Sequence, residues 1–201
     1  GRFQDSCRFH FSSLGKVNED PRVFVYNDWM KILTILSLLL SNQITDLDRW
    51  VKLGEAEISW GYKTPYRINL MSPKGVHDID DIRNGMQAIQ FDIEWLAPST
   101  SKSQVETHFK ELIESQLSDP ESIQFNQITI NRLVNKLPKA NRFDRWQFNF
   151  SPDAGTHVFI DNKKVHTLIG SEINRALYHG WLFRDPVTTS KLLTRLLKLG
   201  K

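Results

Sequence analysis

The chain has 201 residues, of which 40% are hydrophobic and 11% aromatic, enough to build the core of one domain. Its formal charge of +3 is small, and basic residues are interleaved with acidic ones, so nucleic-acid binding is poorly supported. The one cysteine, Cys7, excludes an internal disulfide and leaves no second thiol for a metal site.

The first notable feature along the chain is a candidate export signal. Met30 and Lys31 precede nine mostly apolar residues, 32–40, and polar residues 41–43 follow them. A positive start, a short apolar run and a polar exit are typical of a secretory signal. The run is short for a membrane span, which needs roughly 20 residues. A buried core helix is the alternative interpretation.

The signal divides the sequence into three parts. We expect an upstream segment outside the mature protein (1–29), a signal peptide (30–43) and a single domain (44–201). The mature protein would then be periplasmic or secreted, without a stable membrane span after processing. No pair of small residues marks the cleavage site, so cleavage near Ser41 and an uncleaved anchor both remain open.

Strands open the predicted domain. Residues 50–60 and 66–71 read as two strands, separated by turn residues, and the polar stretch 76–86 predicts an irregular loop. A third strand spans 89–95, where apolar and polar residues alternate strictly. Such alternation indicates one buried face and one face toward water.

Two helices follow these strands. Ser101 begins a capping-box pattern, and the apolar spacing after it predicts an amphipathic helix over 102–117. Asp119 and Pro120 are typical of a second helix start, and an apolar stripe continues from there to Pro138.

The last part of the chain repeats this order of strands followed by helices. The predicted elements are a strand around 146–150, a hairpin of 157–160 and 164–168, a helix over about 170–181, and a last helix capped by Thr188 or Thr189. Alternation of single strands and helices is absent. The order predicts an α+β fold, with an antiparallel sheet covered by helices on one face.

Motifs for catalysis, metals or cofactors are absent from the sequence. No histidine spacing matches a metal site, and His157 with His166 on the hairpin would supply only two ligands. No nucleophile elbow, phosphate-binding loop or dinucleotide-binding motif is present. We therefore predict no catalytic residue, no metal and no cofactor.

Aromatic residues near the first strands are the best candidates for a binding site. Core packing is their default role, and a cavity between sheet and helices with a few polar anchors is the alternative. Under the second interpretation the candidate ligand-binding residues are Tyr62, Tyr66, Arg67 and Trp95. Adjacent strand residues point to opposite faces, so at most one of Tyr66 and Arg67 can face a given cavity.

Three stretches of the sequence resemble the chalcone isomerase-like family, in particular its bacterial exported branch. They are LGEAEISW with YRINL (53–60, 66–70), FDRW through the turn ending in GT (143–156), and IG through LLKLG (169–200). The resemblance covers about residues 48–200. It implies an open-faced sandwich, in which helices layer a large antiparallel sheet.

The resemblance also bears on activity. The plant isomerases of this fold use an Arg, a Thr, a Tyr and an Asn around the cleft. Here the first strand has no Arg, and the other three positions fall near Tyr66, Ser103 and Lys110. Other members resemble fatty-acid-binding proteins, in which an Arg and a Tyr hold a carboxylate. The resemblance therefore favours a binding protein over an isomerase.

Three functions remain open at this point. The first is non-enzymatic binding of a small apolar or fatty-acid-like ligand in the cleft between sheet and helices. The second is an envelope interaction protein that uses exposed aromatics such as Trp50 or Trp60 and has an unknown protein partner. The third is an isomerase or lyase of a carbonyl substrate, in which Tyr62 or Tyr66 acts beside a basic residue.

Overall fold

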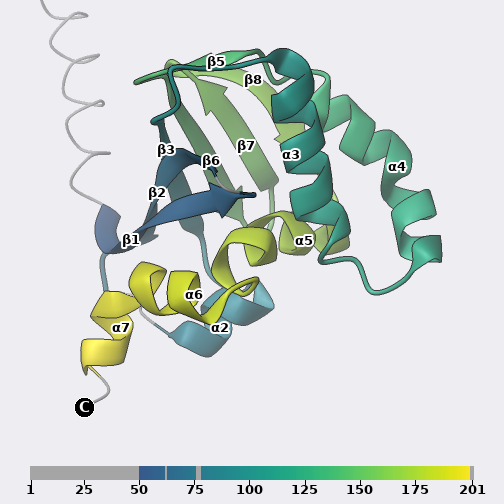
Figure 1. The fold of residues 1–201 in the computed structure, drawn as a ribbon. Helices are drawn as coiled ribbons and strands as arrows, with labels where there is room; N and C mark the ends of the chain where they lie inside the picture. The colour runs from purple at the N-terminus through teal and green to yellow at the C-terminus, as the bar shows by residue number, and fades with distance from the viewer. Residues whose placement is uncertain (1–49, 62, 76–77, 200–201) are drawn as a thin grey trace, which may run out of the picture. The chain divides into compact units, whose positions relative to one another are not determined.

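Six strands form one antiparallel sheet in a computed structural model that describes residues 50–61, 63–75 and 78–199 (Figure 1). They are β1 (Trp50–Trp60), β2 (Lys63–Pro73), β3 (Ile89–Trp95), β6 (Arg145–Ser151), β7 (Gly155–Ile160) and β8 (Lys163–Leu168). The strands lie side by side in their chain order. The expected upstream segment and signal peptide, 1–29 and 30–43, lie outside the described residues.

Helices cover one face of this sheet. Figure 1 shows three of them together on that side: α3 (Lys102–Glu114), α4 (Pro120–Val134) and α5 (Ser171–Leu182). Two short helices, α6 (Pro186–Leu192) and α7 (Thr194–Leu199), pack along β1. The remaining elements are α2 (Ile79–Asn84) and the paired short strands β4 (Ser99–Thr100) and β5 (Ala140–Asn141). The α+β class predicted from the sequence is confirmed.

The alternation of side chains explains why the sheet has one covered face. The apolar residues of β3, which are Ile89, Phe91, Ile93 and Trp95, are all buried beneath the helices. The polar residues between them are half-buried on the opposite face. On that face Arg67 lies near the carboxylates of three glutamates: Glu57 at 3.1 Å, Glu55 at 3.5 Å and Glu94 at 4.0 Å.

Local signals fix the ends of the main elements. Ser101 caps α3 in a reciprocal capping box with Gln104, and Asp119 caps α4 ahead of Pro120. The β7–β8 hairpin turns on Asp161 and Asn162, whose φ angles are 49° and 63°. Asp and Asn tolerate this left-handed conformation better than most residues.

The structure differs from the sequence prediction in several places, and the main differences concern helices. The stretch 76–86 contains α2, capped by Asp78, where an irregular loop was expected. The predicted helix over 102–117 ends at Glu114. The second predicted helix also ends earlier than Pro138, at Val134. The last helix begins earlier than Thr188, because Asp185 caps it, and it is interrupted at Leu193 to give α6 and α7.

Candidate functional site

Two of the residues predicted to bind a ligand meet in the core. Tyr66 of β2 and Trp95 of β3 are cross-strand partners on the covered face, with ring centroids 5.2 Å apart. Both are 1% exposed or less. Arg67 lies on the opposite face, as the alternation of a strand requires. Tyr62 lies outside the described residues. A role in ligand binding for these residues stays a prediction.

The hydroxyl of Tyr66 joins the sheet to two helices. Trp181 of α5 donates its indole N–H to the Tyr66 oxygen at 2.9 Å. The Tyr66 oxygen also lies 2.7 Å from Nε2 of His108 on α3. Since an indole can only donate, we assign the Tyr66 proton to the bond with His108, whose Nε2 then accepts. The three side chains form one buried polar chain across the interface between sheet and helices.

Burial sets the protonation states in this chain. Burial lowers the pKa of His108 to about 4, and the positive charge of Arg184 contributes in the same direction. Burial also raises the pKa of Tyr66 well above its ordinary value, partly offset by the hydrogen bond from Trp181. His108 is therefore neutral and Tyr66 protonated at neutral pH, which agrees with the assigned hydrogen bonds.

Aromatic rings fill the space around the Tyr66 hydroxyl. Trp95 packs on Trp146 with ring centroids 5.0 Å apart. Trp60, at the end of β1, packs against His108 with ring centroids 5.0 Å apart. Its indole N–H donates a hydrogen bond to the Glu111 carboxylate at 3.0 Å. Tyr66 and Trp95 thus lie in a packed region, and neither of two cavities near the surface includes them.

One of these cavities opens between the end of the sheet and α5. It has a volume of about 430 Å³ and is lined by the end of β6, the β6–β7 turn, the β8–α5 loop, α5 and the end of α2. Apolar walls come from Phe150, Pro152 and Ile169. Ile169 is 75% exposed, which makes it an apolar rim. This size is within the usual range of small-molecule sites.

Tyr178 of α5 lines this cavity and carries a buried hydroxyl. The residue is 2% exposed, and its hydroxyl has no hydrogen-bond partner within the described part of the chain. It lies against Gly85, whose φ is +70°, and a Cβ at that position would come within 2.6 Å of the hydroxyl oxygen. Burial raises the pKa of Tyr178 to about 12, although the positive charge of Arg175 acts to lower this pKa. The hydroxyl is therefore a donor with no acceptor.

Arg175 lies three residues before Tyr178 and lines the same cavity. Residues three apart share one face of a helix, so the guanidinium and the phenol are directed to the same side of α5. Arg175 is exposed, and within the described residues no carboxylate lies within 4.0 Å of its guanidinium. The cavity is thus lined by the cation of Arg175, the carboxylate of Asp153, the buried phenol of Tyr178 and apolar walls.

Asn174 holds the walls of this cavity in place. Its amide donates to the carbonyl oxygens of Leu168 at 3.1 Å and Gly170 at 2.7 Å, and its own carbonyl accepts the hydroxyl proton of Thr156. Gly155 approaches so closely that a Cβ there would lie 2.1 Å from the Leu168 oxygen. The loops around the cavity are therefore fixed to β7, β8 and α5 at once.

The sequence analysis did not identify Arg175 or Tyr178 as binding residues. Their spacing on a helix is common, and nothing in the sequence shows that the Tyr178 hydroxyl would be buried without a partner. Within the described residues no group of three or more His, Cys, Asp or Glu side chains could hold a metal ion. No helix in the same residues is long and apolar enough to cross a membrane.

Comparison with known proteins identifies the family of this domain. The model of the chalcone isomerase-like family matches residues 63–198, about two thirds of the sequence. The chain belongs to the chalcone isomerase-like family. A fatty-acid binding protein from Arabidopsis thaliana has a similar structure, with a TM-score of 0.62 and 13% identity, over 74% of this chain and 87% of that one. At that identity the likeness shows the fold alone. No protein with a curated description matches the sequence.

The three positions that the sequence resemblance aligned with isomerase residues are dispersed in the structure. Tyr66 is buried in the core, as described above. Ser103 is exposed in the first turn of α3, where its hydroxyl contacts that of Ser101 at 3.1 Å. Lys110, two turns further along α3, forms an ion pair with Glu114 at 3.8 Å. None of these three side chains lines either of the two cavities.

Proposed function

We propose that this domain is a non-enzymatic binding protein for a small apolar or acyl ligand that carries an anionic oxygen at one end. The observation that carries the proposal is the Tyr178 hydroxyl, which is buried and unpartnered on a residue that lines a cavity of about 430 Å³. A buried donor without an acceptor costs about 1–3 kcal/mol, and a ligand oxygen would remove that cost.

The arrangement of groups suits a carboxylate at the head of the ligand. Arg175 at the mouth provides a planar fork of N–H donors, and Tyr178 provides one further donor. Hydrogen bonds between charged groups are roughly twice as strong as neutral ones, so they would orient the ligand. Phe150 and Ile169 would contact its apolar chain. The family relative that binds fatty acids supports a ligand of this kind.

The same cavity offers little for catalysis. Tyr178, with its pKa raised to about 12, stays protonated at neutral pH and cannot act as a base. No histidine or cysteine lines the cavity, and the one carboxylate among its lining residues, Asp153, is exposed on the β6–β7 turn. These features support binding without turnover.

Export of the domain remains part of the proposal. It is supported by the sequence alone, through the positive start, apolar run and polar exit over residues 30–43. Fractionation of cells that express the full gene, followed by mass determination of the N-terminus, tests this directly. A cytoplasmic protein that retains residues 30–43 would contradict export.

The binding proposal is tested with the full chain, purified gently and examined by native mass spectrometry for a co-purified ligand. Titration calorimetry with dodecanoate then measures affinity, with dodecanol as the analogue that lacks the carboxylate. Arg175→Gln should weaken dodecanoate binding by roughly tenfold, and Tyr178→Phe by a smaller factor.

Arg132→Gln on α4 is the matched control, because it removes the same charge from an exposed position outside the cavity. Its affinity should equal that of the wild type. Absence of any bound ligand together with no response to dodecanoate would reject the proposal and favour an interaction protein. Equal binding of dodecanol would show that Arg175 and Tyr178 do not recognise a head group.

A further inference from the structure

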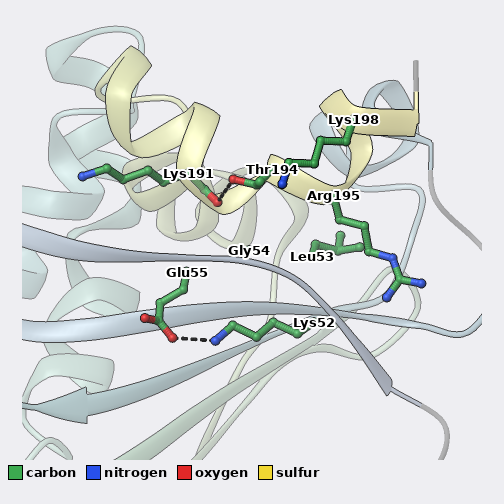
Figure 2. A pocket seen from close by; sticks show the side chains of 8 residues that line it. All are labelled: Lys52, Leu53, Gly54, Glu55, Lys191, Thr194, Arg195 and Lys198. Atoms are coloured by element: carbon green, nitrogen blue, oxygen red, sulfur yellow. Dashed lines mark hydrogen bonds and ion pairs between the residues drawn. The ribbon is translucent and has the colours of Figure 1, made fainter. Parts of the chain in front are cut away.

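A second concave surface lies at the other side of the domain, where α6 and α7 cross β1. It is a groove of about 450 Å³ between residues 52–55 of the strand and the two helices (Figure 2). Four basic residues and one acidic residue line it, a net formal charge of +3. None of these residues belongs to the Tyr178 cavity.

The groove is built on a rigid contact. Gly54 lies where the register of β1 shifts against β2, and the end of α6 rests directly on it. A Cβ at Gly54 would be 2.1 Å from the carbonyl oxygen of Lys191 and 2.3 Å from that of Leu192. Only glycine permits this approach. Leu192 and Leu193 are fully buried beside it, so strand and helices hold the groove in one shape.

The cations of the groove differ in their partners. Lys52 is neutralised by Glu55, whose carboxylate lies 2.5 Å from its amine. Arg195 and Lys198 have no carboxylate within 4.0 Å among the described residues. Figure 2 shows Arg195 extending from α7 toward β1 beside Leu53, with the Lys198 amine directed back toward Thr194.

Some basic side chains of the domain do form ion pairs; the pairs outside the groove are Arg67 with Glu57, Arg83 with Asp80, Lys102 with Glu106 and Lys110 with Glu114. Arg195 and Lys198 lack such a partner among the described residues, as Arg175 does, and what sets them apart is that they line one groove together. Like charges three or four residues apart on a helix repel each other by about 0.2–0.5 kcal/mol per pair. Arg195 and Lys198 have this spacing on α7, and Lys191 lies near the end of α6, so a bound anion would reduce the repulsion between these like charges.

We infer that this groove binds a phosphate group, carried either by a small phosphorylated molecule or by the head group of a phospholipid. A phosphate monoester has a charge of about −1.5 to −2 and three acceptor oxygens, so it can interact with more of the groove's cations than a single carboxylate can. Arg195 would bind two of these oxygens through its guanidinium fork. Lys198 would add a point charge, and Lys191 a longer-range one.

The test uses the full chain and two probes that separate the sources of phosphate. Inorganic phosphate is titrated at constant ionic strength while the backbone amides of Gly54 and Thr194 are followed by NMR. In parallel, sedimentation measures binding to vesicles of equal parts phosphatidylglycerol and phosphatidylcholine, with phosphatidylcholine vesicles as the neutral reference. Binding to either anionic probe should weaken with rising salt, since screening shortens the range of exposed charges.

Charge variants decide whether the groove is responsible. Arg195→Gln with Lys198→Gln should weaken the response by roughly tenfold. The exchange Arg195→Lys with Lys198→Arg keeps the charge and should keep binding within about threefold. Lys163→Gln with Lys164→Gln removes the same charge from the exposed β7–β8 hairpin and serves as the control.

Each outcome has a defined meaning. A saturable response to inorganic phosphate that only the groove variant loses supports a site for a small phosphorylated molecule. Vesicle binding without a phosphate response, lost in the same variant, supports a lipid head group. No response to either probe, or an equal loss in the control, overturns the inference. Because the Tyr178 cavity shares no residue with the groove, dodecanoate binding by these variants is expected to be unchanged.

Discussion

Replacing Tyr66 by Phe removes one buried oxygen that connects the sheet with α3 and α5. The change leaves the indole N–H of Trp181 without an acceptor and Nε2 of His108 without a donor. Each buried group left unpaired costs about 1–3 kcal/mol, so the free energy of unfolding should fall by about 2–5 kcal/mol. For a domain of this size the melting temperature then falls by roughly 5–15 °C.

Tyr178→Phe is the matched control for this prediction. It removes the same hydroxyl from a residue that is equally buried, on a ring with no hydrogen-bond partner for that group. Its free energy of unfolding should be unchanged or rise by up to about 3 kcal/mol, because the change removes a buried donor that has no acceptor. Urea unfolding of the full chain, followed by tryptophan fluorescence, measures both variants. Coincident unfolding curves for the two would refute the role assigned to the Tyr66 network.

Three further predictions concern other parts of the domain. His108 has a folded pKa of about 4 because it is buried, so the unfolded state takes up its proton first as the pH falls. Stability should be full above about pH 6.5 and decline by roughly 3 kcal/mol toward pH 4, and His108→Gln should flatten this difference in urea titrations at several pH values. Gly54→Ala should cost about 3 kcal/mol through its clash with α6, more than Gly61→Ala, where the strain is only conformational; equal melting temperatures would contradict this. Ser101→Ala removes the cap of α3 and should lower stability by about 1 kcal/mol in the same assay, and an unchanged value would show that the cap contributes nothing.

The strands and long helices could be predicted because their signals are local. The alternation in β3 requires one buried face whatever the rest of the chain does, and the structure buries its apolar residues as expected. The cap at Ser101 and the turn at Asp161 and Asn162 depend only on neighbouring residues. The family resemblance added the layering of the sheet, which is confirmed.

Elements that depend on tertiary packing were missed. The helix α2 has a single buried residue, Ile82, and so presents no apolar stripe to recognise. The interruption between α6 and α7 at Leu193 follows from the need to bury this residue and Leu192 against β1 at Gly54. Neither requirement is visible in the spacing of apolar residues alone.

The candidate site was harder to predict than these elements, because it is defined by which polar groups lack hydrogen-bond partners. The two partners of Tyr66 in its buried network, His108 and Trp181, lie 42 and 115 positions after it in the chain. The Tyr178 hydroxyl is isolated by Gly85, which approaches it from another part of the sequence. Sequence patterns predict where a side chain lies on its own element, and they do not reveal what faces it.

The order of strands in the sheet affects how the chain reaches its fold. Three of the five strand pairings join strands separated by two or three residues, and β2 and β3 are separated by residues 74–88, which include α2. By contrast, β3 and β6 are separated by residues 96–144, which include α3 and α4. Closing a longer loop costs more entropy, although the cost grows slowly with length. The sheet therefore consists of two meanders, β1–β3 and β6–β8, whose internal pairings close shorter loops. The pairing of β3 with β6 joins the two meanders into one sheet. A chain cut in the α3–α4 connection, at 115–119, would keep both meanders whole and is the natural place to divide this protein into complementing fragments.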